Sequence, residues 1–208
     1  MNDSSPTADV RTFAIIPAAG ASRRMGTDKL LLPWQGQTVI DTVIDAWTHA
    51  GVDAIVVVAH PENQELISQL RQRQIHLVVP PQPPRQMRES VELGLRLLES
   101  THQPTDADIW LLAPADIPEL SASVINQVVE VAKQAREEIV VPVHDAHRGH
   151  PAAFRWSLAQ EVFALGKEEG VNALFSSHAT REIELGSAAI PADIDTPEDY
   201  QRLGRQTG

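Results

Sequence analysis

The chain alternates short apolar runs with amphipathic segments, and this alternation restricts its fold more than any other feature. Apolar runs typical of buried strands lie at Thr12–Pro17, Asp53–Ala59, Ile75–Val79, Ile109–Ala113 and Glu138–Val143. Segments with helical periodicity separate them, at Thr38–Ala50, Glu62–Arg71, Met87–Glu99 and Ser121–Arg136. Because strands joined by helices pair in parallel, this pattern predicts an α/β fold with a doubly wound, mostly parallel sheet and helices on both faces.

The ends of the first helices have recognisable signals. Thr38 is a good N-cap and Gly51 a good terminator for the first helix, whereas Pro61 is expected to open the second. After Val143 the pattern is weaker. We expect a polar loop at 144–151, a short strand at Ala152–Phe154, two helices, a strand at Glu182–Leu185 and a last helix that starts at Thr196–Pro197.

Size, charge and composition narrow the class of protein. The 208 residues are enough for one domain, which we expect at 11–208, after a mobile polar tail at 1–10. The net charge of −11 argues against partners such as nucleic acid or an anionic membrane. There are no cysteines, and no run approaches the roughly 18 apolar residues of a membrane helix. A cytoplasmic protein with small-molecule substrates is the expectation.

The stretch from Ile15 to Lys29 is the best candidate for a ligand site. It begins as the first strand, turns at Pro17 into small residues, and continues into two arginines and a lysine. Small residues let a backbone approach a ligand, and successive N–H groups of such a turn form an anion-binding concavity. Arg23, Arg24 and Lys29 add positive charge suited to phosphate. This order of residues predicts a phosphate-binding loop.

Acidic residues supply candidate metal ligands. Asp116 lies between Pro114 and Pro118, directly after an apolar strand, where a carboxylate would suit Mg²⁺ beside a bound phosphate. Asp193 and Asp195 would share one side of an extended segment, so either could be a second ligand, although this segment is also a typical helix start. In open α/β sheets ligands bind at the carboxyl ends of strands, so the loop and Asp116 are expected to share one crevice.

Three histidines recur at intervals of three residues, at His144, His147 and His150. Gly149 and Pro151 argue against a helix there, and a strand would send alternate histidines to opposite faces. We therefore interpret this stretch as a substrate-contacting loop rather than a transition-metal site.

The segment Ala18-Ala19-Gly20-x-Ser22-x-Arg24-Met25-Gly26-x-x-Lys29 resembles the signature of MobA-like nucleotidyltransferases. The continuation Leu30–Pro33 is similar to the molybdenum cofactor cytidylyltransferase (MocA-like) branch. Pro114–Pro118 resembles the metal-binding segment of the family, and Gly149-His150-Pro151 with Phe154 resembles its substrate loop. Asp193–Asp199 is similar to its C-terminal segment. The likeness extends over about residues 12–203, and it implies a Rossmann-like fold.

The resemblance implies a transferase that moves CMP from CTP to the terminal phosphate of molybdopterin, with Mg²⁺, and releases pyrophosphate. It implies catalytic roles for Arg24, Lys29 and Asp116, with Asp195 or alternatively Asp193 as a second metal ligand. It implies nucleotide contacts from Ala18, Ala19, Gly20, Ala21, Ser22, Arg24, Met25, Gly26 and Lys29. It implies acceptor contacts from Ser90, Gly149, His150 and Pro151. A molybdoenzyme or its chaperone is a candidate recipient of the product.

The choice of base and acceptor depends on a few positions. Guanylyl-transferring relatives usually have Ala-Gly-Gly where this chain has Ala18–Gly20, and the methyl group of Ala19 would crowd a purine, which favours CTP. The stretch 86–90 has long, charged residues where the cytidylyl branch often has small ones, and 167–172 differs from the pattern Gly-Asp-x-Gly-Ala/Val-Arg that is common there. We expect both stretches near the acceptor. Two alternatives therefore stay open: transfer to a sugar or polyol phosphate, and a non-catalytic chaperone that binds molybdopterin or nucleotide.

Overall fold

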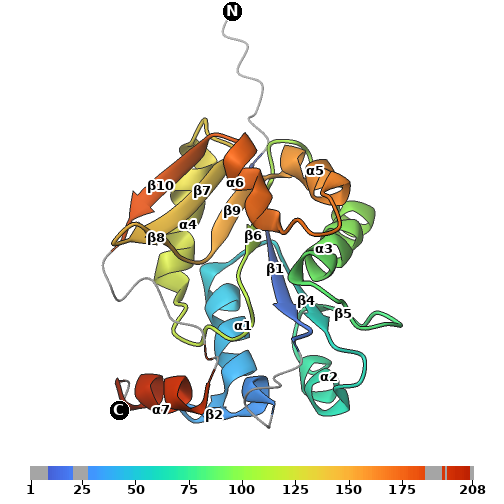
Figure 1. Cartoon of the computed structure of the whole chain (residues 1–208), viewed down its shortest axis with the longest axis vertical. Coiled ribbons are helices and arrows are strands. Elements are labelled where there is room, and N and C mark those ends of the chain that lie inside the picture. Colours follow the sequence, from blue (N-terminus) through green and yellow to red (C-terminus); the bar gives the residue numbers. More distant parts are fainter. Residues whose placement is uncertain (1–8, 21–27, 186–193, 195, 207–208) are drawn as a thin grey trace, which may run out of the picture.

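The structure, a computed structural model, describes residues 9–20, 28–185, 194 and 196–206. Within these ranges the main sheet has eight strands in the order β10-β7-β9-β6-β1-β4-β5, with β8 paired to β7 (Figure 1). The parallel pairs join β1 (Thr12–Ala18), β4 (Ala54–Ala59), β5 (His76–Val78) and β6 (Ile109–Leu112), and separately β7 (Ile139–His144) and β10 (Thr180–Glu184). The mostly parallel, Rossmann-like sheet is therefore confirmed.

Helices cover both faces of this sheet. One core includes residues of α1 (Val39–Ala50), α2 (Gln64–Leu70), α4 (Ala122–Gln134) and α7 (Pro197–Gln206). The other core includes residues of α3 (Met87–His102), α5 (Ala159–Ala164) and α6 (Leu174–Ser177). The remaining short elements are β2 (Pro33–Trp34), β3 (Gln37–Thr38) and the 3₁₀ turns η1 (Lys29–Leu31), η2 (Trp156–Leu158) and η3 (Val171–Ala173).

The inner strand β1 contributes side chains to both cores. Ala14 and Ile16 belong to the α1 side, whereas Phe13 and Ile15 belong to the α3 side, because successive side chains of a strand point to opposite faces. α3 lies very close to this strand at Gly94, where a Cβ would come within 2.8 Å of the Ile15 Cγ2 atom. Glycine at this position lets α3 pack directly on the strand that leads into the candidate loop.

The first helix has the ends that its sequence predicts. The Thr38 hydroxyl accepts from the Asp41 N–H, and Gly51 ends the helix in the left-handed conformation with φ 71°. The start of α2 was predicted incorrectly, because Asn63 rather than Pro61 caps it, accepting from the Leu66 N–H at 3.1 Å. Proline supplies a favourable φ, but an Asn side chain satisfies a backbone donor that would otherwise lack an intrahelical partner.

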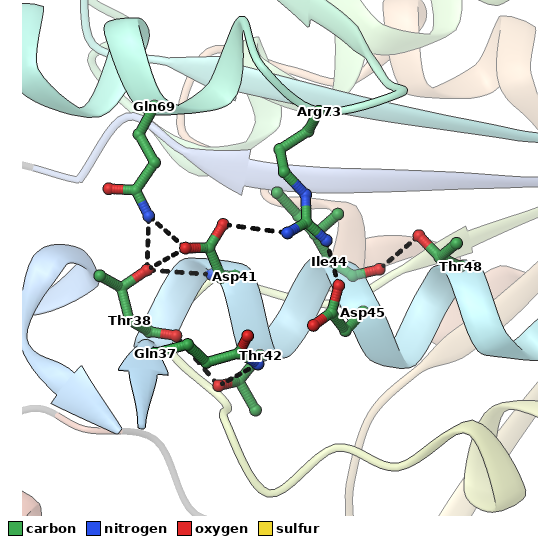
Figure 2. Close-up of polar contacts among 9 residues, drawn as sticks. All are labelled: Gln37, Thr38, Asp41, Thr42, Ile44, Asp45, Thr48, Gln69 and Arg73. Carbon is green, nitrogen blue, oxygen red and sulfur yellow. Dashed lines mark hydrogen bonds and ion pairs between the residues drawn. The ribbon is translucent and has the colours of Figure 1, made fainter. Parts of the chain in front are cut away.

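A polar network joins α1 to the end of α2 (Figure 2). The amide of Gln69 donates to the Thr38 hydroxyl and to Asp41, and Arg73 pairs with Asp41 and Asp45. In Figure 2 Gln69 and Arg73 extend from one chain segment towards acceptors on α1. This network holds two helices of the same face together, close to the start of α1.

The second half of the sheet is less regular than the first. β9 (Ala152–Arg155) runs antiparallel to both β6 and β7 and fills the space between them. The predicted polar loop at 144–151 contains β8 (His147–Arg148), which forms a hairpin with β7 through Asp145 and Ala146. Both turn residues have positive φ, 48° and 62°, as a type I′ turn requires. The expectation of an irregular loop was therefore wrong for this part.

The described part of the C-terminal region returns to the first half of the chain. In Figure 1 α7 lies beside β2. The rings of Trp34 and Tyr200 are 6.2 Å apart, and the Tyr200 hydroxyl donates to the Pro33 carbonyl. Thr196 precedes α7 and its hydroxyl accepts from the Asp199 N–H at 3.1 Å, which agrees with the predicted start of this helix. Among the described residues, no helix is both long and apolar enough to cross a membrane.

Candidate active site

The candidate site lies at the carboxyl ends of β1 and β6. β4 and β5 are added to one side of β1, and the next strand, β6, is added to its other side. The order of the strands in the sheet therefore reverses direction between β1 and β6. Ile15 lies opposite Leu112 in this parallel pair, and the Ala115 N–H donates to the Pro17 carbonyl at 3.2 Å. The two segments that the sequence singles out therefore leave the sheet together, where α/β sheets bind ligands.

Lys29 and Asp116 meet at this edge. The Lys29 ammonium lies 2.5 Å from Asp116 Oδ2 and donates to the Ile194 carbonyl at 2.7 Å. Both side chains are largely buried, with 14% and 18% of their surfaces exposed. The Ile194 N–H donates in turn to the Asp116 carbonyl at 3.0 Å. One ion pair and two hydrogen bonds thereby join three segments that are distant in sequence.

Local interactions fix the position of Lys29. Asp28 caps the turn η1, because its carboxylate accepts from the Leu30 N–H at 3.1 Å and from the side-chain amide of Asn63. Asn63 also caps α2, as described above. Leu30 is buried in the core on the α1 side. The turn that presents Lys29 is therefore anchored both by a polar link to α2 and by apolar packing.

The residues at this edge fit a divalent metal ion. Asp116 Oδ1 is buried and has no hydrogen-bond partner, so one oxygen of this carboxylate is available for a ligand. Mg²⁺ in nucleotide-transferring sites commonly uses one or two carboxylates together with phosphate oxygens and water. The described ranges contain no group of three or more His, Asp or Glu side chains that could hold a metal by themselves. The predicted second ligands, Asp193 and Asp195, lie outside the described residues.

The predicted nucleotide loop is described at its two ends. Ala18 is the last residue of β1, Ala18 and Ala19 are buried, and Gly20 is exposed with open space where a Cβ would lie. Lys29 begins η1 at the other end. The predicted contacts between these ends lie outside the described residues: Ala21, Ser22, Arg24, Met25 and Gly26.

The predicted acceptor residues come from two elements. Ser90 lies near the start of α3 and is 2% exposed. Gly149 donates its N–H to the Pro142 carbonyl at 2.8 Å, and His150 Nδ1 donates to the carbonyl of Leu112 at 3.3 Å. Since Leu112 ends β6, His150 lies beside the strand that leads to Asp116. Ser90 is thus on the α3 face, whereas His150 borders the Asp116 segment.

The three histidines do not converge on one point. His144 and His147 lie opposite each other in the β7–β8 hairpin. The His144 ring faces the carboxylates of Asp145 and Glu184, each at 3.5 Å, and His147 contacts the Asp145 carbonyl. His150 turns instead to β6. His144 and His147 are therefore neighbours on one face of the hairpin, whereas His150 contacts β6.

A comparison with protein families decides the class of this site. The sequence model of the MobA-like NTP transferase domain matches residues 14–182. The chain belongs to this family. It is a nucleotidyltransferase of the MobA type, and both Lys29 and Asp116 lie within the matched residues.

Relatives of this chain are named for the transfer of two different nucleotides, cytidylyl and guanylyl. The chain is 26% identical over 186 residues to the molybdenum cofactor cytidylyltransferase of Escherichia coli strain K12, covering 89% of this chain and 92% of that protein. It is 24% identical over 192 residues to a probable molybdenum cofactor guanylyltransferase of Bacillus cereus strain ATCC 10987, with the same coverages of 89% and 92%.

Solved structures show the same fold. Rv0371c from Mycobacterium tuberculosis H37Rv superposes with a TM-score of 0.78 at 25% identity, covering 94% of this chain and 98% of that one. A 4-diphosphocytidyl-2C-methyl-D-erythritol synthase superposes with a TM-score of 0.76 at 19% identity, covering 97% and 100% of the two chains. This chain, Rv0371c and the synthase therefore share one fold.

Two features of the site have no signal in the sequence. The first is the Ile194 carbonyl, since any residue could supply a main-chain acceptor to Lys29. The second is the contact of Gln86 and Arg88 with the main chain of residues 165–167. Gln86 donates to the Lys167 carbonyl at 3.1 Å, and Arg88 donates to the carbonyls of Leu165 and Gly166 at 2.8 and 2.6 Å. Long side chains at the start of α3 therefore hold the segment that precedes η3.

Proposed function

We propose that this MobA-type nucleotidyltransferase moves CMP from CTP to the terminal phosphate of molybdopterin and releases pyrophosphate. The observation that carries the proposal is the pairing of Lys29 with Asp116 where β1 and β6 end. Transfer of a nucleotidyl group needs positioned substrates and neutralised charge more than covalent catalysis. The largely buried Lys29 ammonium would neutralise phosphate charge, and the largely buried Asp116 carboxylate beside it has an oxygen available for a metal ion.

Different residues of the chain would bind the donor, the metal ion and the acceptor. Lys29 and Arg24 would hold the triphosphate and stabilise the negative charge on the leaving pyrophosphate, with backbone N–H groups of the loop 18–26. Asp116, with Asp195 or Asp193, would hold Mg²⁺. Bound Mg²⁺ would neutralise phosphate charge during the transfer. His150 and Ser90 would contact the acceptor, with Gly149 and Pro151 shaping the loop around His150.

One feature of the chain supports cytidine over guanine as the base of the donor. Ala19 is buried directly after β1, and we infer that its methyl group would crowd a purine where a glycine would leave space. The relatives leave GTP as the competing donor, because a protein named a cytidylyltransferase and one named a probable guanylyltransferase match over comparable lengths. Ala19→Gly would then raise the use of GTP relative to CTP, and an unchanged ratio would exclude a role for this methyl group.

A second candidate keeps the reaction and changes the acceptor to a polyol or sugar phosphate. The residues Pro17–Gly20 resemble the opening of methylerythritol phosphate cytidylyltransferases, and the fold is shared with a synthase of that kind. We infer that the contact of Gln86 and Arg88 with residues 165–167 lies beside the acceptor, where it would make the acceptor site of this chain differ from that of the cytidylyl branch.

We further propose that the protein acts in the cytoplasm and passes its product to a molybdoenzyme or its chaperone.

Release of pyrophosphate distinguishes these candidates. Purified protein is incubated with Mg²⁺, with CTP or GTP, and with molybdopterin or methylerythritol phosphate as acceptor. The proposal predicts release with CTP and molybdopterin. Release with CTP and methylerythritol phosphate alone would replace it by the second candidate. Binding of CTP or molybdopterin without turnover in any combination would instead indicate a non-catalytic carrier.

A further inference from the structure

Lys29 makes its ion pair with the same carboxylate that the proposed function assigns to the metal. Its ammonium lies 2.5 Å from Asp116 Oδ2, and the exposed fractions of the two side chains are 14% and 18%. Charges that are largely removed from water interact more strongly than exposed ones. Lys29 therefore competes with any other cation for Asp116. An ammonium group and a divalent ion bound to the same carboxylate would also repel each other.

The surroundings of Lys29 allow its ammonium group to move away from Asp116 without losing every hydrogen-bond partner. Lysine has a flexible four-carbon stem and three donors, so it can exchange one acceptor for another. It donates to the Ile194 carbonyl at 2.7 Å in addition to its pairing with Asp116. The turn that carries Lys29 is held independently by Asp28, Asn63 and Leu30, so the backbone can stay in place while the ammonium moves.

We propose that Lys29 is an exchangeable cation: it neutralises Asp116 in the nucleotide-free protein and moves to the triphosphate when metal and nucleotide enter. This inference rests on the proposed function of the site. It predicts that the nucleotide-free protein binds divalent metal weakly, because the metal must first displace Lys29. Metal and nucleotide then bind as a unit, since the triphosphate accepts the ammonium that the metal releases.

Binding of Mn²⁺ to the nucleotide-free protein tests the exchange without any turnover. Free Mn²⁺ is measured by electron paramagnetic resonance during titration of the wild type and of Lys29→Met, which removes the charge and keeps the side-chain length. Neighbouring charges commonly change the affinity of a carboxylate for a proton by about 10-fold or more, and we expect a gain of about 10-fold in Mn²⁺ affinity in this variant. Lys133→Met, in α4, is the control with the same change in net charge.

The outcomes separate exchange from a fixed structural pair. The inference requires a gain in Lys29→Met, no gain in Lys133→Met, and loss of the gain when Asp116→Asn is added. Equal Mn²⁺ affinity of Lys29→Met and wild type would overturn it, as would an equal gain in Lys133→Met. Lys29→Gln, which keeps a donor, replaces Lys29→Met if that variant does not fold. Because neither CTP nor acceptor is present, a failure of the proposed transfer reaction leaves this result interpretable.

Discussion

Asp108, directly before β6, offers the sharpest test of what holds this fold together. Its carboxylate is 3% exposed and accepts from the backbone N–H and the guanidinium of Arg11 at 2.9 and 2.6 Å, and from the Thr105 N–H at 2.8 Å. Burial by itself would raise the pKa of Asp108. The hydrogen bonds from Arg11 and Thr105 outweigh that effect and hold the pKa below its ordinary value.

The cost of Asp108→Asn follows from these contacts. The new amide has one acceptor oxygen in place of two and no charge, so the Arg11 guanidinium loses its ionic partner and at least one of the three donors faces an NH₂ group that cannot accept. Hydrogen bonds to charged groups contribute about 1.5–3 kcal/mol each, and Arg11 keeps the carbonyls of His102 and Gln103. We expect a loss of about 3 kcal/mol in the free energy of unfolding, or roughly 6–12 °C in Tm for a protein of this size.

The effect has a defined dependence on pH. A carboxyl with a lowered folded-state pKa contributes stability that is present above its unfolded pKa of about 3.9 and is lost as pH falls through the folded pKa. The difference between wild type and Asp108→Asn should therefore be full at pH 7 and shrink below about pH 4. Urea denaturation at several pH values measures it, with the exposed Asp106→Asn as control. A difference that stays constant at low pH, or an equal loss in Asp106→Asn, would refute the reasoning.

Three further substitutions test the packing around the site. Arg73→Met removes the ion pairs of Figure 2 and should cost about 1 kcal/mol in urea denaturation, because partly exposed pairs contribute little; a loss above about 3 kcal/mol would contradict this. Arg88→Met should speed amide hydrogen exchange in 165–170 by releasing two carbonyls, and unchanged exchange would exclude this role. Gly94→Val should destabilise the fold by about 2–3 kcal/mol, because its side chain would overlap Ile15; wild-type stability would show that α3 can shift.

The first half of the fold could be predicted from the sequence because local signals and tertiary structure agree there. Thr38 and Gly51 bound α1 as expected, and the apolar run at Ala54–Ala59 is a fully buried parallel strand. After β6 local signals are weaker. The short strand at 152–155 was expected, but its antiparallel position between β6 and β7 depends on long-range pairing that a run of four residues does not encode.

The position of the candidate site at one edge of the sheet could also be predicted from the sequence. Strands that alternate with helices place their carboxyl ends together, so Lys29 and Asp116 could be expected at one edge, as the structure shows. The Ile194 carbonyl could not be predicted, because main-chain acceptors have no sequence signal. The contacts of Arg24 and the second metal ligand lie outside the described residues and stay predictions, as do the acceptor roles of Ser90 and His150.

Transfer of the α-phosphate of CTP is the most direct measurement of the central claim. CTP labelled at that phosphate is incubated with Mg²⁺, molybdopterin and either wild type or Asp116→Asn. We predict that the label moves to molybdopterin with wild type and that the variant, which folds like wild type, is slower by about 100-fold or more. Transfer at the wild-type rate by Asp116→Asn, or label that stays on CTP with the wild-type protein, would contradict the account.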